Sequence, residues 1–174
     1  SVYKNGYMVG YSDGLFAPEY NLVLSEAIKV FVDLLGFGSQ ADAQGGYPSG
    51  YAKVASSFSL YKGVSCGFND TVKKKDIANL LYNVMETPVA KMVSFEKGGV
   101  NYATSGEETF MTELMEIYRV NGVMTDNGVS GLTGSSDVSI NQVVCGDVIM
   151  ELAPGKAYAR KYLGRRVMAY YSIA

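Results

Sequence analysis

Apolar side chains recur at helical spacing in two stretches of the chain, and these two stretches match each other. The first covers about residues 22–35 and the second about residues 73–85. At a constant offset of 50, the apolar residues Ala27, Val30, Phe31, Leu34 and Leu35 fall opposite Ile77, Leu80, Leu81, Val84 and Met85. This spacing predicts two equivalent amphipathic helices, with Gly36 ending the first and Pro88 stopping the second.

A short phrase precedes each predicted helix: Gly, an apolar residue, two further residues, Gly, an aromatic residue, one residue and Asp. It occupies residues 6–13 and again residues 63–70. The glycines are offset by 57 rather than 50, because the second copy lacks about seven residues after the phrase. A repeat of this length indicates that the chain is built from modules.

The pattern of the sequence changes after about residue 88, from helical spacing to short strand-like runs. Before it, residues 49–62 predict a third helix, and the small polar stretch 38–46 predicts a loop. After it come a strand pair around a turn at 97–99 and a short helix within 107–115. Further strands are predicted at residues 117–124, 138–144, 147–152 and 166–171. The fold class is therefore α+β, with helical repeats in residues 1–88 and a small antiparallel β barrel or sandwich in residues 89–174.

Composition and charge exclude several classes of function. The 174 residues are 48% hydrophobic and 18% charged, as in folded globular proteins, and the net charge is −2. A binder of nucleic acid or of anionic membranes needs a basic excess, and no apolar run approaches the roughly 20 residues that span a bilayer. No leader sequence precedes the first phrase, which predicts a mature or excised piece of a longer protein.

No residue pattern points to a catalyst. The chain has no His, the commonest general base and metal ligand, and it has no phosphate-binding loop or serine nucleophile motif. Asp13 and Asp70 occupy equivalent turns; paired carboxylates can hydrolyse glycosides, but Asp in such a position is first of all a turn former. We therefore expect no enzyme activity, no metal and no cofactor.

The two cysteines, Cys66 and Cys145, match no metal-binding spacing. Two readings stay open, a disulfide that ties the two halves together or two free thiols, and the second is favoured.

The helical half resembles S-layer homology modules. Residues 10–18 read Gly-Tyr-Ser-Asp-Gly-Leu-Phe-Ala-Pro and reproduce the Gly-Tyr-x-Asp-Gly-x-Phe-x-Pro hallmark of that family in full. The resemblance covers roughly residues 3–88, about one and a half modules. It implies an extracellular protein that binds the anionic secondary polymer of a Gram-positive cell wall. The β half resembles, more weakly, a segment that follows such modules in clostridial surface proteins and has no established activity.

The chain departs from the family where the module helix begins. In place of Thr-Arg-Ala-Glu it has Val-Leu-Ser-Glu at residues 23–26 and Lys-Lys-Lys-Asp at residues 73–76. Leu24 cannot pair with an anion, and Lys74 supplies charge without the bidentate geometry of Arg. The resemblance therefore marks these candidate polymer-binding residues: Tyr11, Asp13, Glu26, Lys73, Lys74 and Asp76.

Each of these candidates also has a purely structural interpretation. Glu26 and Asp76 either cap their helices or orient polymer-binding groups, and capping is favoured. The run Lys73–Lys75 is either a solvated helix start or the contact for an anionic partner. Four tyrosines in two Gly-Tyr-x-x-Gly-Tyr strings pack between repeats or stack on sugars: Tyr7, Tyr11, Tyr47 and Tyr51. A second basic cluster is predicted to be solvated at strand edges: Arg160, Lys161, Arg165 and Arg166.

Taken together, the sequence predicts a non-catalytic cell-envelope protein fragment that anchors to a cell-wall polysaccharide. The alternative is a self-assembling subunit of a surface filament, an S-layer lattice or a virion. One and a half modules leave an unmatched face, which another copy could cover. The expected partners are thus an anionic polysaccharide or other copies in a homo-oligomer, with no nucleic acid and no membrane insertion.

Overall fold

The computed structural model describes residues 10, 15, 17–96, 99–104 and 108–173. It divides into two compact units, Ser1–Leu114 and Met115–Ala174. The composition change after residue 88 therefore does not coincide with this division. Residues 89–114 go with the helices because the backbone returns to them: Ala90 N–H donates to the Leu35 carbonyl at 2.8 Å, and Phe110 N–H donates to the Thr87 carbonyl at 2.9 Å.

The two repeated helices are confirmed. α1 spans Leu24–Leu34 and α4 spans Lys74–Met85. Each begins after an extended residue of nearly the same conformation, Val23 with ψ 160° and Lys73 with ψ 159°. Gly36, at φ +85°, ends the first helix in the left-handed region that favours glycine. The two helix starts thus have the same backbone geometry at an offset of 50 residues.

The stretch predicted as a loop contains a short helix, so that prediction is wrong. α2 spans Gly38–Ala43, and α3 spans Ser49–Ser57. Ala41 of α2 is completely buried, and an added Cβ on Gly50 of α3 would lie 1.9 Å from the Ala41 carbonyl oxygen. Close packing of α2 against α3 therefore stabilises a helix in a sequence with little hydrophobic periodicity.

The third helix is shorter than its periodicity predicted. It ends at Ser57 instead of continuing to residue 62. Ser59 takes a positive φ of 56°, and the Leu60 N–H donates back to the Ala55 carbonyl at 2.9 Å, which is the geometry of a helix C-terminal cap. The turn places Leu60 in the core, where it is fully buried.

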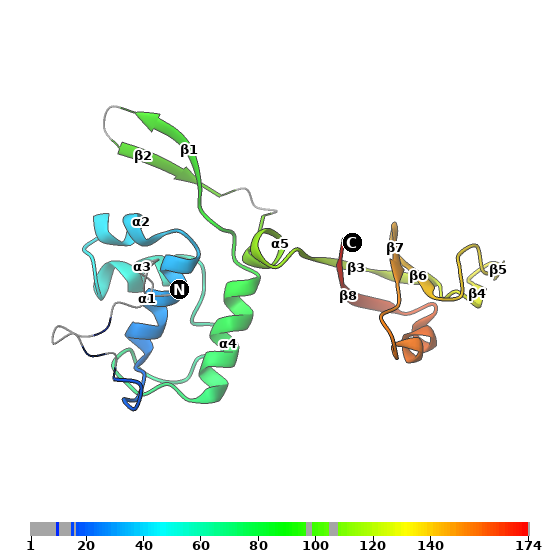
Figure 1. The fold of residues 1–174 in the computed structure, drawn as a ribbon, viewed down its shortest axis with the longest axis horizontal. Coiled ribbons are helices and arrows are strands. Elements are labelled where there is room, and N and C mark those ends of the chain that lie inside the picture. The colour runs from blue at the N-terminus through cyan, green and yellow to red at the C-terminus, as the bar shows by residue number, and fades with distance from the viewer. Residues whose placement is uncertain (1–9, 11–14, 16, 97–98, 105–107, 174) are drawn as a thin grey trace. The chain divides into compact units, whose positions relative to one another are not determined.

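The core of the first unit lies among α1, α2, α3 and α4 (Figure 1). Its most deeply buried large side chains come from each part of the helical half: Ile28, Val32, Leu35, Val54, Leu60, Leu80 and Val84. After α4 the chain forms the predicted hairpin of β1 (Lys91–Glu96) and β2 (Gly99–Ala103), whose turn lies outside the described residues. The short helix α5 (Phe110–Leu114) follows, as predicted.

The second unit is an antiparallel sheet whose long strand β3 spans Ile117–Asp126. The order is β5-β4-β3-β6-β7, and β8 also pairs with β3. These strands are β4 (Ser130–Gly131), β5 (Gly134–Ser135), β6 (Gln142–Cys145), β7 (Val148–Glu151) and β8 (Arg166–Ser172), with a 3₁₀ helix η1 at Ala157–Tyr162. The α+β class is therefore confirmed.

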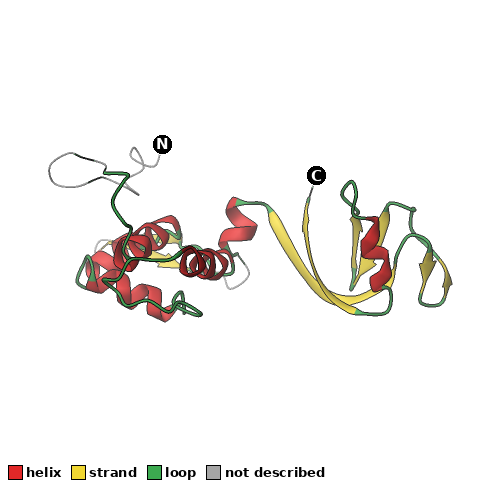
Figure 2. Cartoon of the chain, turned by 90° about the horizontal axis from the view of Figure 1, so that it is seen from below, coloured by secondary structure: helices red, strands yellow, loops and turns green. Residues whose placement is uncertain are grey.

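The sheet curves into a half-barrel rather than closing as the predicted barrel or sandwich (Figure 2). The first seven residues of β3 pair with β8, and its last residues pair with β6 and β4. Gly122 lies just before the point where β3 changes its pairing from β8 to β6. A Cβ on Gly122 would lie 2.8 Å from the Gly146 nitrogen, so glycine permits the two backbone segments to approach closely. β6 is also shorter than predicted, because the Gln142 N–H closes a turn onto the Ser139 carbonyl at 2.8 Å.

Both cysteines are free thiols. Cys145 is fully buried in the small core of the sheet, whereas Cys66 is half-buried beside the second phrase. Burial raises the pKa of the Cys66 thiol. Cys66 belongs to the first unit and Cys145 to the second.

Candidate functional site

The second copy of the phrase lies against the start of α1. The Leu24 N–H donates to the Asp70 carbonyl at 3.1 Å, and the Ser25 N–H donates to the Phe68 carbonyl at 2.9 Å. In return the Val72 N–H donates to the Leu22 carbonyl at 3.0 Å, across an antiparallel bridge between Val23 and Thr71. Because Val72 leads directly into α4, these bonds bring the starts of α1 and α4 side by side. We call this arrangement, residues 22–25 with residues 68–74, the paired helix starts.

An acidic side chain caps each of these helices. Glu26 Oε2 accepts from the Val23 N–H at 3.1 Å, and Asp76 Oδ2 accepts from the Lys73 N–H at 3.3 Å. A helix leaves its first N–H groups without intrahelical acceptors, and a carboxylate in the first turn satisfies them. The capping interpretation of Glu26 and Asp76 is therefore confirmed.

Asp76 also makes a second set of hydrogen bonds. Its Oδ1 accepts from the N–H of Ser65 at 3.0 Å and from the Ser65 hydroxyl at 3.1 Å. The side chain is completely buried, and the bonds from Ser65 hold the pKa of the Asp76 carboxyl below its usual range. Asp76 is thus an ionised structural residue that fixes the second phrase to its own helix.

The lysines before Asp76 remain at the surface. Lys73, Lys74 and Lys75 are all exposed, and within the described residues none of the three forms an ion pair. Cations at a helix N-terminus oppose the helix dipole by a few tenths of a kcal/mol. The structure therefore leaves three ammonium groups beside the paired helix starts with the capacity to contact an anion.

The first copy of the phrase, with Tyr11 and Asp13, lies outside the described residues. Its counterpart in the second copy is described. Asp70 Oδ2 accepts from the Gly67 N–H at 2.8 Å, and the Asp70 N–H donates to the Gly67 carbonyl at 3.0 Å. Asp70 is therefore a turn former, as the structural interpretation of the phrase predicted.

An aromatic and charged cluster extends from the α1 start along α1 and α3. The Tyr47 hydroxyl donates to Ser25 Oγ at 3.2 Å, and the Tyr51 hydroxyl donates to Asp33 Oδ1 at 3.1 Å. Lys29 Nζ lies 2.7 Å from Asp33 Oδ2 and 5.6 Å from the centre of the Tyr51 ring. The sequence reasoning named both tyrosines but missed Lys29 and Asp33, although their i,i+4 spacing is a signal for an ion pair.

The two tyrosines of this cluster have different environments. Tyr51 is buried, and burial followed by the charge of Asp33 raises the pKa of its hydroxyl. Tyr47 is 49% exposed and meets the Tyr51 ring edge-on, with ring centres 6.3 Å apart. Packing therefore accounts for Tyr51, whereas Tyr47 presents a ring surface that a sugar could contact.

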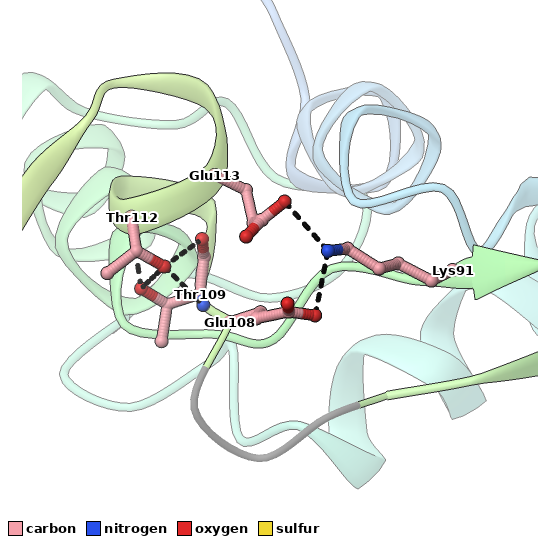
Figure 3. A network of polar contacts seen from close by, with 5 residues as sticks. All are labelled: Lys91, Glu108, Thr109, Thr112 and Glu113. Atoms are coloured by element: carbon pink, nitrogen blue, oxygen red, sulfur yellow. Dashed lines mark hydrogen bonds and ion pairs between the residues drawn. The ribbon is translucent and has the colours of Figure 1, made fainter.

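A separate polar network holds α5 to the start of β1 (Figure 3). Lys91 Nζ lies 2.8 Å from Glu108 and 2.9 Å from Glu113, and these bonds raise the pKa of Lys91. The Thr109 N–H donates to Thr112 Oγ1 at 2.9 Å at the beginning of α5. Each charge has an opposite charge beside it, so the network stabilises the local fold and offers no open binding group.

In the second unit the buried carboxylate is Asp126. It accepts from the Ser136 hydroxyl at 2.6 Å, the Asp137 N–H at 2.8 Å and the Gly128 N–H at 2.8 Å. These bonds, with that from Ser136 the strongest, hold the pKa of Asp126 below its usual range. Asp126 thus organises the loop around β4 and β5.

The predicted basic cluster divides between two environments. Arg165 and Arg166 are exposed where β8 begins, in agreement with the prediction of solvated strand-edge positions. Arg160 is half-buried and donates to the Ile140 carbonyl, while Lys161 lies 5.1 Å from the centre of the Tyr162 ring. The cluster is therefore only in part a solvated edge.

The described residues contain no group of three or more acidic, Cys or His side chains that could hold a metal ion. In the same residues, no helix is long and apolar enough to cross a membrane.

Over 91 residues the chain is 31% identical to "Cell surface protein" of Thermoanaerobacter kivui. Half of this chain is similar to part of a cell surface protein. The matched stretch is 52% of this chain and 11% of that protein, so the chain spans about a tenth of the relative's length. No family model and no solved structure matches the chain.

Proposed function

We propose that this chain is a non-catalytic, extracellular part of a cell-surface protein and that its helical unit binds an anionic cell-wall polysaccharide. The observation that carries the proposal is the set of exposed lysines 73–75, without ion-pair partners among the described residues, at the paired helix starts. The complete turn hallmark at residues 10–18 and the similarity to a cell surface protein support it.

The contacts suggest which groups would take part. Tyr47 is hydrogen-bonded to Ser25, which is bonded to Phe68 in the second phrase, and the phrase leads through Thr71 to Lys73. A continuous series of contacts therefore joins the exposed ring of Tyr47 to the lysines. An aromatic ring suits the apolar face of a sugar, and ammonium groups suit phosphate or carboxylate substituents. Glu26 and Asp76 support this surface through the backbone rather than touching the polymer.

The replacement of the family's Arg predicts weak, salt-sensitive binding. Lys74 occupies the Arg position of the second copy, and Leu24 occupies that of the first. An exposed ammonium group acts as a point charge that salt screens readily, whereas Arg forms two directed hydrogen bonds to one anion. We therefore expect affinity to come from several lysines acting on a repeating polymer.

The absence of enzyme activity is part of the proposal. The buried carboxylates Asp76 and Asp126 are both engaged by several donors, and their pKa values are lowered. A general acid needs a raised pKa to hold its proton near neutral pH, so neither residue suits that role.

Sedimentation with purified cell-wall sacculi tests the polymer proposal. We expect the protein to pellet with sacculi that retain their secondary polymer and to stay in solution with sacculi stripped of it. The double variant Lys73→Gln/Lys74→Gln should lose most of this binding. The matched variant Lys53→Gln/Lys62→Gln, which removes two exposed lysines elsewhere in the same unit, should bind as the unchanged protein does. Equal recovery with intact and stripped sacculi would overturn the proposal.

A further inference from the structure

Positive side chains gather in a short segment of the second unit, where the coil between β7 and β8 leads into β8 (Figure 1). Residues 156–166 contain no Asp or Glu and include two tyrosines, Tyr158 and Tyr162. Their five cations are Lys156, Arg160, Lys161, Arg165 and Arg166. We call residues 156–166 the basic segment.

The basic segment contains no carboxylate that could neutralise it. Within the described residues, none of its five cations forms an ion pair. Lys91 of the first unit, by contrast, contacts both Glu108 and Glu113. Because like charges held close together repel one another, an anion beside the basic segment would stabilise it.

Two of the ammonium groups converge on one exposed ring. Lys156 Nζ lies 5.8 Å from the centre of the Tyr158 ring, and Lys161 Nζ lies 5.9 Å from the same centre. Both lysines are exposed, and Tyr158 is 59% exposed. Cation–π attraction offsets part of the repulsion between the two ammonium groups. An aromatic ring beside two cations suits a ligand that joins an apolar sugar face to acidic groups.

Arg160 fixes the basic segment to the rest of the second unit. Its guanidinium donates to the Ile140 carbonyl, and its own carbonyl accepts from Asn127 Nδ2 at 3.0 Å. These two bonds tie η1 to the turn after β3 and to the loop before β6. A surface that is held in place before binding loses less conformational entropy when a ligand arrives.

Charge and the comparison with known proteins favour a polymer strand as the ligand. The whole chain carries a net charge of −2, so a wide anionic membrane surface meets repulsion as well as attraction. A single strand along the basic segment interacts mainly with charges within the Debye length of about 8 Å at physiological salt. The similarity to part of a cell surface protein favours a wall polysaccharide over nucleic acid.

We propose that the basic segment is a second binding site for an acidic polysaccharide. Lys156 and Lys161 contact its phosphate or carboxylate groups, and Tyr158 contacts a sugar ring. Arg165 and Arg166 follow η1 in an exposed turn, where they extend the positive surface. The class of ligand rests on the proposed function, but the site lies in the other unit and does not need the lysines of the first.

Titration of the isotope-labelled full chain, followed by the NMR shifts of its backbone amides, tests the proposal. Three probes share one sugar backbone: carboxymethyl dextran, dextran phosphate and unmodified dextran. We expect at least one acidic dextran to shift the amides of residues 156–166, which also identifies the preferred acidic group. Unmodified dextran should leave these amides unchanged, and the affinity for the acidic probe should fall as salt is added.

Two variants remove the proposed contacts. Lys156→Gln/Lys161→Gln should weaken binding at the basic segment about tenfold, the effect of losing two exposed ion pairs. Tyr158→Ala should weaken it by a smaller factor. Lys53→Gln/Lys62→Gln removes the same charge from exposed positions of the first unit and should bind there as the unchanged protein does. Thermal melts followed by circular dichroism establish that each variant is folded.

The variant Lys73→Gln/Lys74→Gln separates this proposal from binding by the helical unit. It should keep the shifts at residues 156–166, and its residual binding to sacculi then comes from the second site. Shifts confined to the first unit, or an unchanged affinity in Lys156→Gln/Lys161→Gln, would overturn the second site and leave the first proposal standing. Binding at the basic segment only to phosphatidylglycerol vesicles or to single-stranded DNA would overturn the choice of a polysaccharide.

Discussion

Asp76 accepts two hydrogen bonds from Ser65, one from its backbone N–H and one from its hydroxyl, across eleven residues of sequence. The same carboxylate caps α4 through the Lys73 N–H. One buried side chain therefore ties the second phrase to the helix that follows it. Because the phrase in turn binds the α1 start, Asp76 stabilises the contact between the two copies of the repeat.

Replacing Asp76 should destabilise the helical unit strongly. Asp76→Ala removes the buried carboxylate that accepts from the Ser65 N–H, the Ser65 hydroxyl and the Lys73 N–H, so three hydrogen bonds are lost together. We expect a clear loss in melting temperature, with Asp76→Asn intermediate because its amide oxygen still accepts. The exposed substitution Asp147→Asn is the control and should change the melting temperature little.

The pH dependence of stability follows from the same residue. The pKa of Asp76 is lower in the folded protein than the usual value of about 4 in an unfolded chain. Its contribution is therefore complete above about pH 4 and is lost as the pH falls through the lower folded value. Urea midpoints measured from pH 7 downward should fall less in Asp76→Asn than in the unchanged protein. Parallel curves for the two proteins would contradict this assignment.

Gly50→Ala should destabilise the packing of α2 on α3. The added Cβ would lie 1.9 Å from the Ala41 carbonyl oxygen, so the two helices have to separate. Overpacking of this kind costs about 1–3 kcal/mol or more in the free energy of unfolding. Ser49→Ala, at the exposed neighbouring position, should stay within about 0.5 kcal/mol. Urea denaturation of the two variants measures the difference, and equal midpoints would show that the helices adjust without cost.

Two adjacent leucines of α4 should respond differently to the same substitution. Leu80 is completely buried, and Leu80→Ala should lower the free energy of unfolding by about 2–5 kcal/mol. Leu81 is 46% exposed, so Leu81→Ala should cost less than about 1 kcal/mol at a concentration where the protein is monomeric. Chemical denaturation at low protein concentration makes the comparison. A larger loss at Leu81 would mean that the core is rotated about α4.

The sequence predicted the helices and strands whose periodicity is strong. The starts of α1 and α4, the β1–β2 hairpin, α5 and the principal strands of the second unit follow from alternation and from glycine, proline and asparagine turns. It missed α2 because Ala41 is held by contact with Gly50, which lies beyond any local pattern. It overextended α3 because burial of Leu60 requires a turn at Ser59.

The candidate site residues also divide into those that the local sequence predicted and those that depend on tertiary contacts. Charge and position alone indicated that Glu26 and Asp76 cap their helices and that lysines 73–75 face solvent. The ion pair of Lys29 with Asp33 and its contact with Tyr51 depend on how α3 packs on α1, so no single stretch of sequence displayed them.

The sequence by itself determined that the chain is repeated, that each repeat places a turn before a helix, and that the two helix starts differ in charge. These are local properties, set by residue type and by spacing along the chain. Only the tertiary structure decided that the second phrase binds the first helix, that Asp76 is buried, and that α4 exposes the face that α1 buries. Those facts depend on contacts between distant segments, where backbone hydrogen bonds and the burial of apolar area select the arrangement.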